Sequence, residues 1–138
     1  MNLKLSNSTK IVLVITCFIA SVIGFLMKLP SAFRHIDKQL HFSFYFLAAA
    51  FLNILFSIKN PLKHILVAAL LCAFGICIEF AQEKYNKVFH VHFHGRFDPE
   101  DVKANLHGLI AFSIVWGIVM LARFIFHSAK KTSEGINN

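Results

Sequence analysis

The chain has 138 residues, of which 57% are hydrophobic, and a formal net charge of +7. A soluble domain of this size has too small a core to bury so much apolar surface, which argues against an ordinary globular fold. The basic residues flank apolar runs, so we expect membrane lipids rather than nucleic acid as their partners.

Four apolar runs follow one another along the chain, at residues 11–27, 40–58, 65–78 and 106–122. Each approaches the ~20 residues that a helix needs to cross a bilayer, the third because it continues to residue 82. The helices of a soluble bundle would carry a polar stripe at helical spacing, and these runs carry none. We therefore predict an all-α, polytopic membrane protein that forms a bundle of four transmembrane helices.

The length predicts one domain with polar ends. Residues 1–10 are a polar N-terminal segment, residues 11–126 are expected to form the four-helix membrane domain, and residues 127–138 a disordered tail. The first apolar run resembles a signal peptide, but it is longer than most signal cores and three further apolar runs follow. We therefore expect an uncleaved first helix.

Polar residues border the second run at its start. Asp37 and His41 are four residues apart, so a helix places both side chains on one face. The alternative is that Asp37 only supplies a negative charge at the N-terminus of this helix. After this run, Pro61 suits the first turn of the third helix.

The third run also ends in polar residues. Glu79 and Gln82 are three residues apart and share one face of a helix. A carboxylate at the centre of a bilayer costs on the order of 3 kcal/mol or more, and less near the interface. Glu79 lies about one turn inside the expected boundary. It should therefore be protonated, paired with a cation or turned toward the interior of the bundle.

A histidine-rich insert follows, with His90, His92 and His94 at alternate positions. In an extended segment alternate side chains share one face. Three imidazoles on one face can bind Zn²⁺ or a similar divalent metal. The alternative is that these histidines are simply solvated in a loop at the membrane surface.

Asp98 and Pro99 predict the start of the fourth helix, with Asp98 as its N-cap and Pro99 at its first position. Asp101 and Asn105 are four residues apart and share a face with Gly108. An Asn in the first turns of a membrane helix needs a hydrogen-bond partner. Gly108 would allow another helix to approach closely at this point.

With four spans, the first and third connections lie on the same side of the membrane. The polar residues that border them are predicted to form one ligand-binding site, made of Asp37, Lys38, His41, Glu79, Gln82, Arg96, Asp101 and Asn105. Lys and Arg divide equally between the two sides, so the positive-inside rule gives no orientation. The scarcity of acidic residues in the tail and in the short second connection favours cytoplasmic N- and C-termini.

In these residues the chain resembles the VanZ-like family of small integral membrane proteins. That family's pattern is Asp-Lys and His-Phe entering one helix, Glu-x-x-Gln leaving another, and then Arg, Asp-x-x-Asp, Asn and Gly. The matching residues lie between roughly residues 36 and 111 and are Asp37, Lys38, His41, Phe42, Glu79, Gln82, Arg96, Asp98, Asp101, Asn105 and Gly108. The stretch between Gln82 and Arg96 is longer than the family usually has, and the alternating histidines are not part of its pattern.

The resemblance implies a protein of the bacterial cell envelope, located in the inner (cytoplasmic) membrane. The family is named for a protein that raises resistance to the glycopeptide teicoplanin, so the resemblance also implies a link to this resistance. It does not supply an established reaction. The activity must therefore be argued from the site itself.

Three functions remain open. The first is to bind or modulate a lipid-linked or other amphiphilic envelope component, with Lys38 and Arg96 engaging an anionic head group. The second is that of a membrane enzyme acting on a phosphate- or acyl-containing lipid, with or without a metal. Its candidate catalytic residues are His41, Glu79 and Asp101. The third is purely structural, with the polar residues tying the helices of the bundle together.

Overall fold

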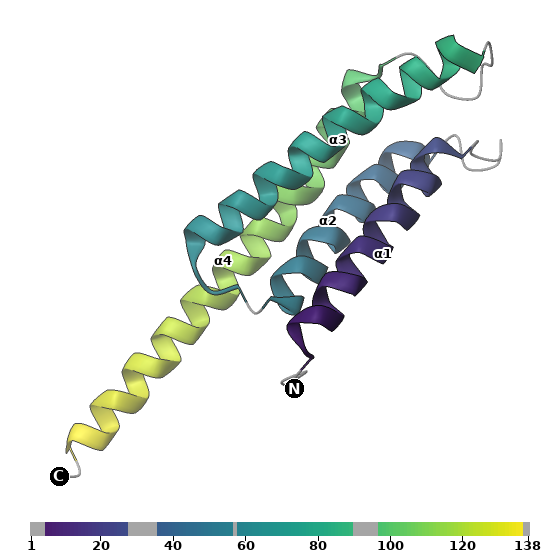
Figure 1. Cartoon of the computed structure of the whole chain (residues 1–138). Helices are drawn as coiled ribbons and strands as arrows, with labels where there is room; N and C mark the ends of the chain where they lie inside the picture. The colour runs from purple at the N-terminus through teal and green to yellow at the C-terminus, as the bar shows by residue number, and fades with distance from the viewer. Residues whose placement is uncertain (1–4, 28–35, 57, 90–96, 137–138) are drawn as a thin grey trace.

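The structure is a computed structural model that describes residues 5–27, 36–56, 58–89 and 97–136. Its elements are the helices α1 (Asn7–Leu26), α2 (Asp37–Leu55), α3 (Pro61–Phe89) and α4 (Pro99–Ile136) (Figure 1). The described residues contain no β-strand. The prediction of an all-α protein is therefore confirmed.

Three of these helices, α1, α3 and α4, are long and apolar enough to cross a membrane, with mean hydropathies of 2.2 to 2.3. Most of their apolar residues lie outside the interior of the bundle, since 22% of the apolar window of α3, 11% of that of α4 and none of that of α1 is buried. Such surfaces suit hydrocarbon rather than water. α2 is not among the three, because its first turn carries Asp37, Lys38 and Gln39 and its interior adds further polar side chains.

The starts of two helices follow the predicted pattern. Asp98 Oδ1 accepts a hydrogen bond from the backbone N–H of Glu100 at 2.8 Å, and Asn60 Oδ1 accepts one from that of Leu62 at 2.8 Å. Pro99 and Pro61 stand at the first helical positions of α4 and α3. A proline suits this position because its missing N–H would have no partner within the helix. The predicted helix starts at Pro61 and Pro99 are confirmed.

α2 and α4 form the most extensive helix pair, and α3 packs against both. α2 and α4 approach each other closely at Gly108 of α4. A Cβ atom there would clash with the backbone carbonyl oxygen of Phe42 and lie 3.1 Å from the backbone nitrogen of Phe46, both on α2. The close helix approach predicted at Gly108 is therefore confirmed, and its partner is α2. A small apolar core lies beside this contact, made of Tyr45, Ala49, Leu109 and Phe112.

The two longest helices extend beyond their predicted ends. α3 continues from the expected limit at residue 82 to Phe89, and α4 continues to Ile136. The prediction of a disordered tail from residue 127 is therefore wrong as far as Ile136. Between Arg123 and Gly135 the sequence contains neither Gly nor Pro, the two residues with the lowest helix propensity, so nothing in it ends the helix early.

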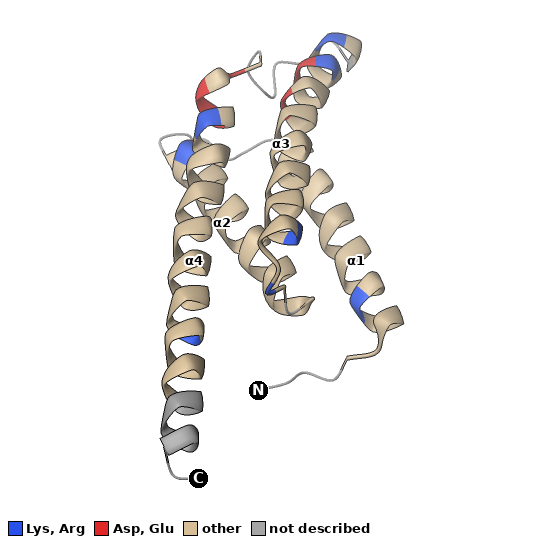
Figure 2. Ribbon diagram, turned by 90° about the vertical axis from the view of Figure 1, so that its left-hand side faces the viewer, with Lys and Arg blue, Asp and Glu red and all other residues tan. Residues whose placement is uncertain are grey.

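The helices alternate in direction, so the end of α3 and the starts of α2 and α4 lie at one end of the bundle (Figure 1). The starts of α1 and α3 and the end of α2 lie toward the other end. Acidic residues gather where α3 ends and α4 begins (Figure 2). The sequence-based expectation that the polar residues of the first and third connections share one end is confirmed for the described residues.

Replacing Gly108 with Ala should force α2 and α4 apart, because the added Cβ meets backbone atoms of α2 that cannot rotate away. We expect Gly108→Ala to lower the free energy of unfolding by about 1–3 kcal/mol. Thermal unfolding of the detergent-solubilised protein would measure the change.

Gly117→Ala is the matched control on the same helix. A Cβ at Gly117 has no atom within 4 Å, so this variant should gain only the higher helix propensity of Ala, worth about 1 kcal/mol. Equal melting temperatures for the two variants would contradict the close helix contact at Gly108.

Candidate functional site

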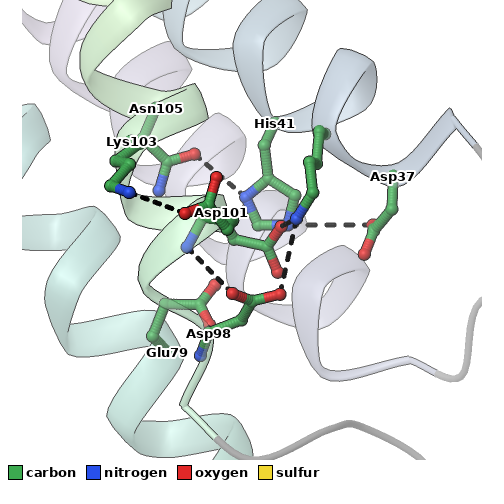
Figure 3. A network of polar contacts seen from close by, with 9 residues as sticks. Asp37, His41, Glu79, Asp98, Asp101, Lys103 and Asn105 are labelled. Carbon is green, nitrogen blue, oxygen red and sulfur yellow. Dashed lines mark hydrogen bonds and ion pairs between the residues drawn. The ribbon is translucent and has the colours of Figure 1, made fainter.

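Polar side chains from three helices meet at the end of the bundle where α4 begins (Figure 3). His41 comes from α2, Glu79 from α3, and Asp101 and Asn105 from α4, and each of these residues is no more than 8% exposed. More exposed polar residues surround them. We call the whole set the polar cluster: Asp37, Lys38, His41, Glu79, Asp98, Asp101 and Asn105.

The imidazole of His41 is held from both sides. Its Nδ1 lies 2.9 Å from Asn105 Oδ1, and because an amide oxygen only accepts hydrogen bonds, Nδ1 is the donor. Its Nε2 lies 3.8 Å from Asp37 Oδ1, so the predicted placement of these two residues on one helix face is confirmed. The ring of Phe25 from α1 packs against the imidazole with 5.2 Å between ring centroids. The orientation of His41 is thus fixed, with Nε2 directed toward a carboxylate.

Lys38 joins two acidic residues of α4. Its Nζ lies 3.5 Å from Asp98 Oδ2 and 3.6 Å from Asp101 Oδ1, while its side chain stays 54% exposed. The pair with Asp98 is exposed on both sides, and an ion pair of this length at the surface contributes little to stability. The consequence of the two ion pairs is geometric, because they place the ammonium group over the start of α4.

Glu79 is buried beneath this start. Its Oε2 accepts a hydrogen bond from the backbone N–H of Asp98 at 3.4 Å. Its Oε1 is buried without a hydrogen-bond partner among the described residues, and so is Asp101 Oδ1. Buried carboxylate oxygens without a donor are costly to keep. The predicted turn of Glu79 toward the bundle interior is confirmed, whereas a cation paired with it is not seen in the described part of the chain.

Three residues of the polar cluster have the geometry of a metal site. Asp37, His41 and Asp101 each offer one ligand atom, and these atoms lie within 4.8 Å of one another. The metal site predicted at His90, His92 and His94 falls outside the described residues. That site stays a prediction.

The structure brings together most of the predicted ligand-binding residues: Asp37, Lys38, His41, Glu79, Asp101 and Asn105. Gln82 makes a different contact, in which its Nε2 donates to the backbone oxygen of Phe25 at 2.7 Å. It therefore ties α3 to the end of α1. Arg96 lies outside the described residues.

That Tyr45 and Gly75 lie beside the polar cluster was not predicted from the sequence. Tyr45 is fully buried one helical turn after His41, and its hydroxyl has no hydrogen-bond partner among the described residues. At Gly75 a Cβ would lie 2.8 Å from Asn105 Nδ2 and 2.9 Å from Tyr45 Oη, so α3 approaches both side chains closely. The four-residue spacing of His41 and Tyr45 is the signal that would have found the tyrosine.

A second polar contact, also not predicted, lies nearer the opposite end of the bundle. His64 Nδ1 lies 3.0 Å from Asn53 Oδ1, and its Nε2 lies 3.0 Å from Ser113 Oγ. The imidazole stacks on the ring of Trp116, with 4.3 Å between centroids and an interplanar angle of 3°. This contact joins α2, α3 and α4, and both nitrogens of its imidazole have hydrogen-bond partners. In the polar cluster, by contrast, Glu79 Oε1 has none among the described residues.

No family model, no curated protein and no solved structure matches the chain. The resemblance to the VanZ-like family therefore stays a prediction, and the function must be argued from the geometry.

Replacing Glu79 with Gln separates a structural role from a functional one. The amide keeps an oxygen for the backbone N–H of Asp98 and removes a buried charge with an unpaired oxygen. We expect Glu79→Gln to fold in parental yield and to melt at the same or a higher temperature. Folded yield by size-exclusion chromatography and thermal unfolding would measure both quantities.

His64→Ala is the contrasting variant, because it leaves Asn53 and Ser113 without their shared partner. It should lower the free energy of unfolding by about 1–3 kcal/mol. A loss of folded Glu79→Gln protein would show instead that the polar cluster mainly ties the bundle together.

Proposed function

We propose that this protein binds the anionic head group of a lipid-linked or other amphiphilic component of the bacterial cell envelope. The supporting observation is an open groove of about 330 Å³ beside the polar cluster, on the start of α2 and α4. Basic and apolar side chains line it together. The lining residues are Lys38, Gln39, Phe42, Glu100, Lys103, Ala104 and His107.

The chemistry of the groove suits an anionic amphiphile. Lys38 and Lys103 supply positive charge, and Glu100 is already paired with Lys103 at 2.6 Å. Phe42 is 37% exposed and supplies an apolar wall. Large exposed apolar residues continue from the groove along α4, at Leu106 and Ile110. A phosphate on an acyl or polyprenyl chain matches this order of charged and apolar surface better than a free phosphate does.

Lys38 connects the groove to the polar cluster. It lines the groove and also pairs with Asp98 and Asp101. The acidic residues thus orient a cation toward the head group, which is the role that we propose for them. The family resemblance adds Arg96, which lies outside the described residues, as a further basic residue for the head group.

This proposal predicts that basic residues at this end determine lipid retention. Lys38→Ala and Lys103→Ala should each weaken binding of phosphatidylglycerol by about fivefold, since a basic residue near an anionic surface contributes about 1 kcal/mol. Arg96→Ala should abolish retention of the native lipid. Native mass spectrometry of the protein, extracted gently from its own membranes and then mixed with phosphatidylglycerol or phosphatidylcholine, would measure both effects.

Lys63→Ala is the control, because Lys63 lies at the start of α3, at the opposite end of the bundle. Equal lipid retention by all four variants would contradict the proposal. Chemical conversion of the added lipid would favour the membrane enzyme instead, with His41, Glu79 or Asp101 as catalytic residues. A deletion strain with unchanged susceptibility to teicoplanin would contradict the resistance link that the family resemblance implies.

We further propose that α2 crosses the membrane as the fourth span, with both termini in the cytoplasm of a bacterial cell. The burial pattern of α2 supports a crossing. Its polar residues His41, Tyr45 and Asn53 are buried together with Ala49, so they face other helices rather than lipid. In a background without the native cysteines, Lys38→Cys should react with a membrane-impermeant thiol reagent from outside the cell. Lys59→Cys should react only after the membrane is opened, and labelling of both from the same side would contradict a crossing by α2.

A further inference from the structure

We propose that Asp37, His41 and Asp101 bind a divalent transition-metal ion such as Zn²⁺ or Mn²⁺, with Glu79 as a neighbouring carboxylate. This site is separate from the histidine insert at residues 90–94. The inference deepens the function proposed above, and its second part, the coupling to the head group, rests on that function.

The three ligand atoms are already close to a binding arrangement. They lie within 4.8 Å of one another, whereas ligands at ~2.1 Å from a tetrahedral metal are about 3.4 Å apart. The side chain of Asp37 is 42% exposed and lies in the first turn of α2, so it is free to rotate toward His41 and Asp101. A contraction of about an ångström would complete the three-ligand set.

The hydrogen bond of His41 prepares it as a ligand. A metal-binding imidazole commonly donates its other N–H to a carbonyl or carboxylate oxygen, which fixes the ring and its tautomer. Here Nδ1 donates to Asn105 Oδ1 at 2.9 Å, so the lone pair of Nε2 faces Asp37. Asn105 is itself only 3% exposed and is therefore held in place.

Glu79 provides an independent indication of a cation. Only 3% of the surface of Glu79 is exposed, and its Oε1 has no hydrogen-bond partner among the described residues. Asp101 and His41 are close enough to interact with it electrostatically, and Figure 3 shows its carboxylate beside those of Asp98 and Asp101. Acidic groups gathered in this way repel one another unless a proton or a cation lies between them. A divalent ion at Asp101 would offset that repulsion.

The ligand types select the class of ion. One imidazole with carboxylates suits Zn²⁺ and Mn²⁺, whereas Ca²⁺ and Mg²⁺ prefer oxygen ligands alone. Zn²⁺ should therefore bind more tightly than Mg²⁺.

A metal at this site would change the role of Lys38. Its ammonium group lies 3.6 Å from Asp101, the same carboxylate that the metal would take. The ion would take the place of this ammonium group at Asp101 and leave Lys38 paired with Asp98 alone, so that more of its charge would be available to a head group in the groove that it already lines. Metal binding should therefore strengthen head-group binding, and the head group should strengthen metal binding by the same factor.

The experiment uses the full-length protein in detergent after treatment with a chelator, in a His90→Ala/His92→Ala/His94→Ala background. This background removes the insert as a source of bound metal. Isothermal titration with Zn²⁺ should show one ion per chain. His41→Ala and Asp101→Asn should each weaken binding at least tenfold, whereas Glu83→Gln, at an acid of α3 that pairs with Lys87 and does not line the groove, should leave it unchanged. Lys38→Met should bind Zn²⁺ at least as tightly as the parent, because a competing cation is removed.

Circular dichroism and size-exclusion chromatography would show which variants fold. If His41→Ala does not fold, Asp37→Asn replaces it, since Asp37 is half-exposed and Asn keeps nearly the same size and one oxygen at this position. Absence of Zn²⁺ binding in the triple-alanine background would overturn the inference. Zn²⁺ affinity that is unchanged in both Asp101→Asn and the folded His41 or Asp37 variant would also overturn it.

A second arm separates this inference from the proposed function. Binding of added phosphatidylglycerol to the protein in detergent is measured by native mass spectrometry with and without Zn²⁺. Zn²⁺ binding at this site without phosphatidylglycerol binding would contradict the head-group function and leave the metal site standing. Phosphatidylglycerol binding that depends on Lys103, without Zn²⁺ binding at this site, would contradict only the metal site. We expect both, with phosphatidylglycerol binding at least fivefold tighter when Zn²⁺ is present.

Discussion

The hydrogen bond between His41 and Asn105 is the contact on which the site depends. In a membrane each buried polar side chain needs a partner within the protein, because lipid offers none. This bond joins α2 to α4 one turn before Gly108, where the two backbones approach too closely for any side chain. On α3, Gly75 faces Asn105 with a similar lack of space. The two glycines therefore set the distance at which the imidazole and the amide can meet.

The position of this bond also determines where the acidic residues lie. Asp37 is one turn before His41 on α2, and Asp101 is one turn before Asn105 on α4. Once His41 and Asn105 are joined, the two carboxylates come to the same end of the bundle on facing helices. If the apolar helices cross a membrane, this end of the bundle would lie near its surface, where a charged group is less costly than at the bilayer centre. The arrangement thus holds several carboxylates together without placing them in the middle of the hydrocarbon.

The two buried histidines show how differently the ends of the bundle are built. Both nitrogens of His64 have partners, and its ring stacks on Trp116. Such a contact is what stability alone requires. At the other end, Glu79 Oε1 lacks a hydrogen-bond donor among the described residues, and Asp101 Oδ1 has only the ion pair with Lys38 at 3.6 Å. Stability alone does not explain that, because apolar residues in these places would be less costly. The difference supports a ligand-binding role for the polar cluster and a structural role for His64.

The sequence was sufficient for the features that depend on spacing within one helix. The four-residue spacings of Asp37 with His41 and of Asp101 with Asn105 put the right side chains on one face, and the parity of the connections put them at one end. Contacts between helices were harder, because they depend on how each helix is rotated against its neighbours. Gln82 shares a face with Glu79 in sequence but bonds to the end of α1. His64 lies on α3 and its partners come from the two other helices of the contact, α2 and α4, so no spacing within one helix relates them to it.

The acidic character of the polar cluster is the main constraint on any account of its function. Among the described residues it has four carboxylates, those of Asp37, Glu79, Asp98 and Asp101, and Lys38 as its one permanent cation. Such a set repels an anionic head group when taken alone. The polar cluster can attract an anionic head group only through the cations that it holds, because these carry the charge that faces the groove. Lys38 is one such cation, and a metal at His41 would be a second. On this argument the head-group site and the metal site are parts of one arrangement, since the first needs positive charge that the second would supply.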